Sequence, residues 1–106
     1  MIIEIRTYHV RPGERDRFVH FFEHKSGPVQ RSKGIKLFGP VVDLENENTV
    51  VYLRGFATLQ ERSRIRALFY EGPEWRNQLK AEARSMLQSC DVMLAATTSD
   101  MFNFDD

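Results

Sequence analysis

The sequence predicts an α+β fold with the element order βαββαβ, in which an antiparallel four-stranded sheet carries its helices on one face. Three observations support this prediction. Residues 2–10 and 49–56 alternate in the manner of strands, and residues 14–25 and 58–71 repeat apolar side chains at helical spacing. Glycine-proline pairs and polar runs separate these segments. A chain of 106 residues is also of a size for one domain, which we expect to span residues 1–106.

The first and third strands are the most regular segments. The first ends at Arg11-Pro12-Gly13, where proline cannot donate to a ladder and glycine permits a turn. The third is rich in β-branched and aromatic residues. One face of this pair, the polar-aromatic face, carries Glu4, Arg6, Tyr8, Val50, Tyr52, Arg54 and Phe56. The opposite face carries Ile3, Ile5, Thr7, Val51 and Leu53.

The second and fourth strands are expected over residues 35–44 and 90–98. The second contains Gly39-Pro40, and a proline inside a strand predicts an edge position or a bulge. The polar run 45–48 is expected to join the second strand to the third as a hairpin.

Two helical regions lie between the strands. We expect Gly27-Pro28 to interrupt the first, and Gly34 to close the short turn that follows. Thr58 and Glu61 have the capping-box spacing, so the second region begins there and changes helix at Gly72-Pro73. The inward side chains expected from these helices are Phe18, Phe21, Phe22, Ile65, Leu68, Phe69, Trp75, Leu79, Ala83 and Met86.

This element order is the ferredoxin-like arrangement, which leaves one face of the sheet without helices. We expect the uncovered face to be the polar-aromatic one, because a monomer rarely exposes such a patch and a second sheet could cover it. The predicted assembly is a homodimer, a dimeric α+β barrel. Glu4, Arg6 and Arg54 would then line a partly polar lumen and pair with one another.

Composition excludes several classes of protein. Fifteen Lys and Arg balance fifteen Asp and Glu, which argues against nucleic-acid binding. No apolar run approaches the length of a membrane span, and the N-terminal segment lacks the pattern of a signal peptide. The single cysteine, Cys90, cannot form an internal disulfide, so we expect a reducing, cytoplasmic location.

An ordered series of short motifs resembles the NIPSNAP family over about residues 2–96. The series consists of Glu4-Ile5-Arg6-Thr7-Tyr8, Arg11-Pro12-Gly13, Gly34, Leu37-Phe38-Gly39, Asn48 with Val50-Val51, Arg62 through Arg66-Ala67, and Gly72-Pro73-Glu74-Trp75. The resemblance implies a dimeric α+β barrel and, for a chain of this length, a bacterial cytoplasmic protein. It supplies no agreed reaction. The wider fold group includes cofactor-independent monooxygenases, lactone isomerases and haem enzymes, and fold alone does not choose among them.

Arg6, Tyr8, Tyr52 and Arg54 form the principal candidate ligand-binding site, since the first and third strands are neighbours in this arrangement. Guanidiniums and phenols together suit an anionic, aromatic or carbonyl-bearing ligand. The structural alternative is that the arginines pair with Glu4 and the tyrosines fill space. Trp75, at a helix start, is a further candidate that would border a cavity, with core packing as its alternative.

The segment His20-Phe21-Phe22-Glu23-His24 fits the H-x-x-E-H motif of inverted zinc peptidases. Both histidines lie opposite the phenylalanine stripe by helical geometry, so we expect a solvated helix face and no metal site.

Three other features carry two interpretations each. His9 is expected to be a surface residue, with acid–base catalysis as the alternative. Cys90 is expected to be an inert thiol and not a nucleophile. Arg62, Arg64 and Arg66 are expected to form a solvated helix face and not a nucleic-acid surface.

Two functions therefore remain open. The first is a small dimeric barrel that binds or converts a small organic molecule, by cofactor-free oxygenation or isomerisation. The second is a non-catalytic interaction domain with a packed lumen, which binds a protein through its outer helices or through Phe102 and Phe104 in the tail. Whether the protein is an enzyme stays open at this point, and no cofactor is predicted.

Overall fold

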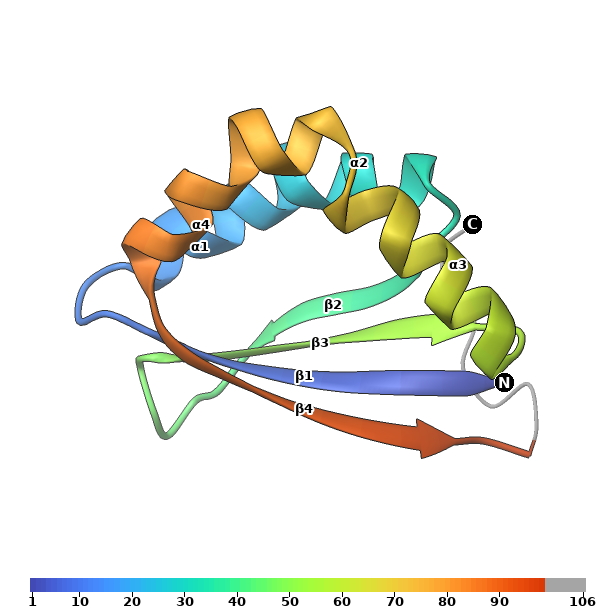
Figure 1. The fold of residues 1–106 in the computed structure, drawn as a ribbon. Coiled ribbons are helices and arrows are strands. Elements are labelled where there is room, and N and C mark those ends of the chain that lie inside the picture. The colour runs from blue at the N-terminus through green and yellow to red at the C-terminus, as the bar shows by residue number, and fades with distance from the viewer. Residues whose placement is uncertain (99–106) are drawn as a thin grey trace.

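The computed structural model of the protein describes residues 1–98, so the tail with Phe102 and Phe104 lies outside the described residues. Figure 1 shows a curved sheet with all helices on one side. The elements are β1 (Ile2–Val10), α1 (Arg15–Phe21), a π-helical turn (Phe22–Ser26), α2 (Gly27–Ser32), β2 (Lys36–Val42), β3 (Thr49–Phe56), α3 (Leu59–Tyr70), a second π-helical turn (Trp75–Leu79), α4 (Lys80–Met86) and β4 (Leu87–Ala96).

The sheet has the strand order β2-β3-β1-β4, and each neighbouring pair is antiparallel. The predicted α+β, ferredoxin-like arrangement is therefore confirmed. The sequence predicted an edge position or a bulge for Gly39-Pro40, and both are present: β2 is an edge strand, and its register with β3 shifts between Phe38 and Val41. Val50 and Val10 are fully buried in the layer between sheet and helices.

The helical boundaries follow local chemistry. The Thr58 hydroxyl accepts a hydrogen bond from the Glu61 amide at 3.0 Å, which confirms the predicted cap of α3. Gly34 follows α2 with a φ of +100°, a conformation that favours glycine. The junction of α4 and β4 differs from expectation. β4 begins at Leu87, directly after α4, three residues before the predicted start at Cys90.

The expected interruption at Gly27-Pro28 is wrong, because a π-helical turn carries the helix through it. The Gly27 amide donates to the carbonyl of Phe22, five residues back. Pro28 then lies in the first turn of α2, where its missing N–H costs least. A Cβ at Gly27 would lie 2.7 Å from the Phe22 oxygen, so the turn requires glycine.

The prediction of which sheet face stays open is also wrong. The polar-aromatic face is the one that the helices cover: Glu4, Tyr52 and Arg54 are buried beneath them. The open face carries Ile5, Leu53 and their neighbours instead. The alternation of β1 and β3 separates two sets of side chains correctly, but both sets contain large apolar residues. Alternation alone does not say which set the helices contact.

Candidate functional site

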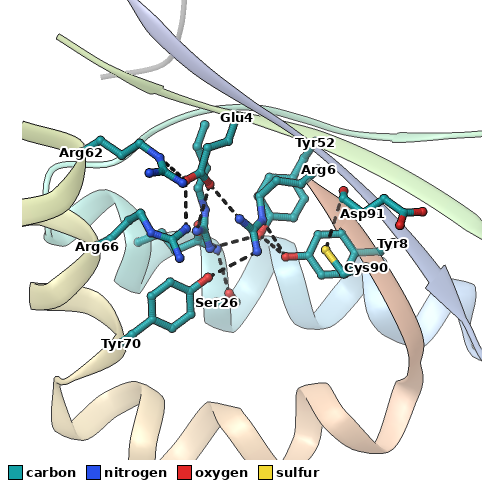
Figure 2. A network of polar contacts seen from close by, with 12 residues as sticks. Glu4, Arg6, Tyr8, Ser26, Tyr52, Arg62, Arg66, Tyr70, Cys90 and Asp91 are labelled. Atoms are coloured by element: carbon teal, nitrogen blue, oxygen red, sulfur yellow. Dashed lines mark hydrogen bonds and ion pairs between the residues drawn. The ribbon is translucent and has the colours of Figure 1, made fainter. Parts of the chain in front are cut away.

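A single buried carboxylate organises the polar groups beneath the helices (Figure 2). Glu4 is 0 % exposed and contacts four guanidiniums. Its Oε1 accepts from Arg6 Nη1 at 2.7 Å and from Arg54 Nη1 at 3.4 Å. Its Oε2 accepts from Arg62 Nε at 2.7 Å and from Arg66 Nη1 at 2.8 Å. The predicted pairing of Glu4 with Arg6 and Arg54 thus exists, but it lies between the sheet and the helices of one chain and not on an open sheet face.

The electrostatics of this cluster favour the charged forms of Glu4 and Arg6. Burial alone would raise the pKa of Glu4, but Arg54, Arg6 and Arg66 outweigh it and lower that pKa to about 2. Burial alone would lower the pKa of Arg6, but the oxygens of Tyr52, Tyr8 and Tyr70 raise it above the ordinary value. The buried ionic groups are therefore stable only as a set.

Tyr8 and Tyr52 form a stacked pair next to the arginines, with ring centroids 5.2 Å apart. Tyr8 Oη accepts from Arg6 Nε at 2.9 Å, and Tyr52 Oη accepts from Arg54 Nη2 at 3.3 Å. The two hydroxyl oxygens, 2.9 Å apart, share one hydrogen bond. That bond uses one of the two hydroxyl hydrogens. Within residues 1–98 no acceptor takes the second, which leaves it available to a ligand oxygen.

The Tyr8 hydroxyl acts as a neutral group near pH 7. Burial raises its pKa well above the ordinary value of 10, and the neighbouring Tyr52 adds to this against the opposing charges of Arg6 and Arg54. Tyr8 therefore can take part in a hydrogen bond to an oxygen atom but does not serve as a base.

Besides its bonds to Glu4 and Tyr52, Arg54 is held by a chain of hydrogen bonds from the helix side. Its Nε donates to Gln30 Oε1 at 2.8 Å, and Gln30 in turn donates to Ser26 Oγ at 2.9 Å. Ser26 belongs to the first π-helical turn and Gln30 to α2. This chain of bonds fixes the guanidinium plane between the sheet and the helix.

A cavity of about 40 Å³ lies between the tyrosine pair and the helices, which is room for a few water molecules. Its lining is mostly aromatic and consists of Tyr8, Phe18, Phe21, Phe22, Ser26, Tyr52, Arg54, Phe69, Tyr70, Trp75, Ala83 and Leu87. Trp75 packs on Phe69 and Tyr70, with ring centroids 5.5 Å and 5.3 Å apart. It forms the wall of the cavity as well as part of the packed layer, so both interpretations of this residue hold.

The structure brings the four predicted residues together and adds Trp75 to the same wall. His9 lies elsewhere, on the open face of the sheet, where it pairs with Asp91 at 3.0 Å. The rings of His20 and His24 contact each other in a tilted arrangement, with centroids 4.4 Å apart. Across residues 1–98, no group of three or more His, Cys, Asp or Glu side chains is arranged to hold a metal ion.

The expectation that three arginines form a solvated face of α3 is wrong for two of them. Arg64 is exposed and pairs with Glu61, whereas Arg62 and Arg66 reach inward to Glu4. Leu68, expected to point inward, is instead exposed. The inner stripe of α3 runs through residues 62, 65, 66 and 69, a spacing that was visible in the sequence.

Ser26, Gln30 and Tyr70 also belong to the site, although they were not among the residues predicted from the sequence. Tyr70 Oη accepts from Arg6 Nη2 at 3.5 Å, and its ring lies 5.3 Å from Arg54 Cζ. Tyr70 follows Arg66 by four residues, so the same helical spacing could have found it. No short-range pattern marks Gln30, because its partner Arg54 is 24 residues away.

Among the residues that the structure describes, this arrangement can polarise an oxygen atom but holds no free base. The phenol hydrogen and the guanidiniums can donate to a carbonyl or enolate oxygen in a site shielded from water. Glu4, the ionised carboxylate of the cluster, is already bonded to four arginines. Among residues 1–98 the site therefore offers charge stabilisation and binding, not proton abstraction.

Across residues 1–98, no helix has the length and apolar character needed to cross a membrane.

Known proteins match this chain in sequence and in fold. The NIPSNAP family model matches residues 3–100. A NIPSNAP-like domain protein from Burkholderia xenovorans is 27% identical with a TM-score of 0.85, covering 98% of this chain and 90% of its own. A second NIPSNAP domain protein from the same organism is 16% identical with a TM-score of 0.85, covering 97% and 100%.

The fold also extends beyond this family. A putative antibiotic biosynthesis monooxygenase from Nitrosomonas europaea is 10% identical with a TM-score of 0.71, covering 93% of this chain and 100% of its own. No curated protein matches the chain. Because the family model spans nearly the whole sequence and the solved relatives share its complete fold, the chain belongs to the NIPSNAP family.

Proposed function

We propose that this protein binds a small organic molecule in the cavity between its sheet and helices, and orients it through a carbonyl, enol or phenol oxygen. The observation that carries the proposal is the unused hydroxyl hydrogen of the Tyr8–Tyr52 pair, which borders an aromatic cavity beside Arg54. A buried donor without an acceptor is costly in a folded protein, and a ligand oxygen would satisfy it.

The volume of the cavity limits how much of the ligand can lie inside it. About 40 Å³ accepts the oxygen-bearing end of a ligand but not a whole molecule, since ligand pockets commonly reach several hundred Å³. The body of the ligand therefore extends toward the uncovered part of β4, where Val92 and Leu94 are about half exposed on the helix side of the sheet.

For the chemistry, we propose cofactor-free oxygenation in preference to isomerisation. Isomerisation moves a proton between two atoms and needs a base within reach. The site described above has none free among residues 1–98, so we propose a substrate acidic enough to arrive already ionised as an enolate or phenolate, whose oxygen the donors of the site would bind. Dissolved O2 is the oxidant: one of its oxygen atoms becomes a carbonyl oxygen of the product, and the other leaves as water with the two hydrogens that the substrate loses. The fold shared with a putative antibiotic biosynthesis monooxygenase agrees with this choice by analogy.

The fluorescence of Trp75 tests the proposal, because Trp75 is the sole tryptophan of the chain and lines the cavity. A panel of phenols and cyclic ketones is titrated against the protein. We expect a saturable change for at least one compound, weakened by Tyr52→Phe and unchanged by Ser63→Ala, which removes an exposed hydroxyl from α3. Equal binding by the two variants would contradict the role of the tyrosine pair.

A non-catalytic interaction domain is the second candidate, and the small cavity is the observation that favours it. Ala83→Leu separates the two, because Ala83 lines the cavity and a larger side chain would fill it. If the cavity is only packing space, the variant keeps every binding property of the wild type.

We also propose that two copies associate through the open face of the sheet. An apolar row crosses all four strands in register, formed by Met93, Ile5, Leu53 and Phe38. Met93 is 62% exposed and Phe38 44% exposed, and face-to-face packing of two sheets would bury them. We expect wild-type dimers, and monomers for Leu53→Arg, in sedimentation velocity.

We also propose that the protein is located in the bacterial cytoplasm. The solved relatives come from Burkholderia and Nitrosomonas, which are bacteria, and Cys90 is a free thiol. A free thiol is typical of a reducing compartment. Fractionation of cells that produce the tagged protein checks this location.

A further inference from the structure

The buried cluster around Glu4 carries more positive than negative charge. Four arginine guanidiniums contact it, and Glu4 is the carboxylate that hydrogen-bonds to them among residues 1–98. Three positive charges thus stand in excess in a region from which water is largely excluded. Such an excess is unfavourable unless solvent or an anion compensates it.

The excess charge reaches the surface at one place. Arg6 and Arg54 are almost fully buried, but the side chains of Arg62 and Arg66 are 23% and 31% exposed. Each uses one nitrogen to bind Glu4. Their other N–H groups have no acceptor within residues 1–98, so the two guanidiniums present free donors at the rim of the cluster.

The rim adjoins both the cavity and an apolar strip. The Cζ atom of Arg66 lies 5.1 Å from the ring centroid of Tyr70, which lines the cavity. In the sheet, Arg6 pairs in register with Val92, and Glu4 pairs with Leu94. The two β4 side chains are 46% and 49% exposed on the helix side, so an apolar surface begins where the arginines end.

We propose that the ligand of this protein is an amphipathic anion, whose carboxylate or phosphate oxygens bind Arg62 and Arg66. Its apolar body lies along Val92 and Leu94 toward the aromatic cavity. The planar guanidinium matches either anionic group with paired N–H donors. This inference rests on the function proposed above, because it names the chemical class of ligand for the same site.

Three probes test the inference by NMR on the full chain labelled with ¹⁵N: benzoate, its neutral analogue benzamide, and inorganic phosphate, all at equal ionic strength. The reporters are the side-chain Nε–H signals of Arg62 and Arg66 and the indole signal of Trp75. Variants are Arg62→Gln/Arg66→Gln and the matched control Arg64→Gln, whose side chain is exposed on the same helix.

We expect benzoate to shift the signals of both arginines and of Trp75. The double variant should weaken benzoate binding by about tenfold or more, the effect of losing roughly one charge-assisted hydrogen bond. Arg64→Gln should leave it unchanged. Benzamide should bind more weakly than benzoate to the wild type and equally to all variants. A shift of the arginines by phosphate, stronger than by benzoate, would support the anionic class and assign the group as a phosphate.

Other results would overturn the inference. If neither anion shifts the arginine signals more than chloride does, or if Arg64→Gln weakens binding as much as the double variant, no anion site exists there. If benzamide shifts Trp75 as strongly as benzoate does, the cavity function stands and the anionic class is wrong. If benzoate shifts the arginines but not Trp75, the anion does not belong to the ligand of the cavity.

Discussion

On the helix-covered face of the sheet, β1 and β3 present Glu4, Arg6, Tyr52 and Arg54, all buried and hydrogen-bonded. On the open face, the same two strands present Ile5 and Leu53, which pair in register within an apolar row. A conventional core would reverse this placement, with charge outside and hydrocarbon inside. This difference supports our proposals that the covered face binds a ligand and that the open face associates with a second copy of the chain.

Replacing Glu4 should have the largest effect, because it removes the carboxylate that faces four arginines. Glu4→Gln should lower the free energy of unfolding by about 3–5 kcal/mol, the cost of breaking a buried ion pair. Urea denaturation measures this. The control is Glu61→Gln, which breaks an exposed pair with Arg64 and should cost about 1 kcal/mol or less. Equal losses of unfolding free energy in the two variants would contradict the claim that the buried charges stabilise the fold more than the exposed ones.

Acid should weaken the covered face through the same carboxylate. The pKa of Glu4 is lowered from 4.5 to about 2 on folding, so its ionised form stabilises the fold at pH values above 4.5. That contribution, about 3 kcal/mol, should be lost as the pH falls from 4.5 toward 2. Thermal unfolding across this range measures it, and the slope should be smaller in Glu4→Gln. An unchanged slope in the variant would assign the acid sensitivity to other groups.

Removing one hydroxyl should have an intermediate effect. Tyr52→Phe deletes the acceptor of the Arg54 hydrogen bond and the partner of Tyr8, but keeps the ring. The expected loss of unfolding free energy is about 1–2 kcal/mol, since a buried charged donor loses one acceptor. Chemical denaturation measures this loss. A variant more stable than the wild type would show that the hydroxyl is retained for function at the expense of stability.

The smallest effect is expected for a hydrogen-bonded pair on the open face. His9 and Asp91 pair across β1 and β4 at 3.0 Å, and both are substantially exposed. His9→Ala should change the free energy of unfolding by less than about 1 kcal/mol. It also should not alter the Trp75 fluorescence response to ligands. A large loss of binding would restore the catalytic interpretation of His9.

The sequence predicted the element order, the cap at Thr58 and the cluster of Arg6, Tyr8, Tyr52 and Arg54, because these follow from local periodicity. It did not predict which face the helices cover. That choice depends on contacts between distant segments, such as Arg62 with Glu4, 58 residues apart. It also did not predict the π-helical turn at residues 22–26, which lets Gly27-Pro28 continue a helix.

The role of α3 was the most informative error. Its three arginines follow one another closely in the sequence, and charged side chains on a helix are commonly exposed to solvent. Spacing separates them: residues 62 and 66 lie on the stripe of Ile65 and Phe69, whereas Arg64 lies on the far side. An arginine on an apolar stripe indicates a buried acid opposite it, and Glu4 is that acid.

Native mass spectrometry of the protein purified from the organism that makes it tests the central claim most directly, namely that the covered face binds a small molecule. Wild type and Ala83→Leu are compared before and after denaturation. The account predicts that the wild type carries a small anionic organic molecule, released on unfolding, and that filling the cavity removes most of it. Wild-type protein without any such molecule, or an equal amount bound to both proteins, would contradict the account.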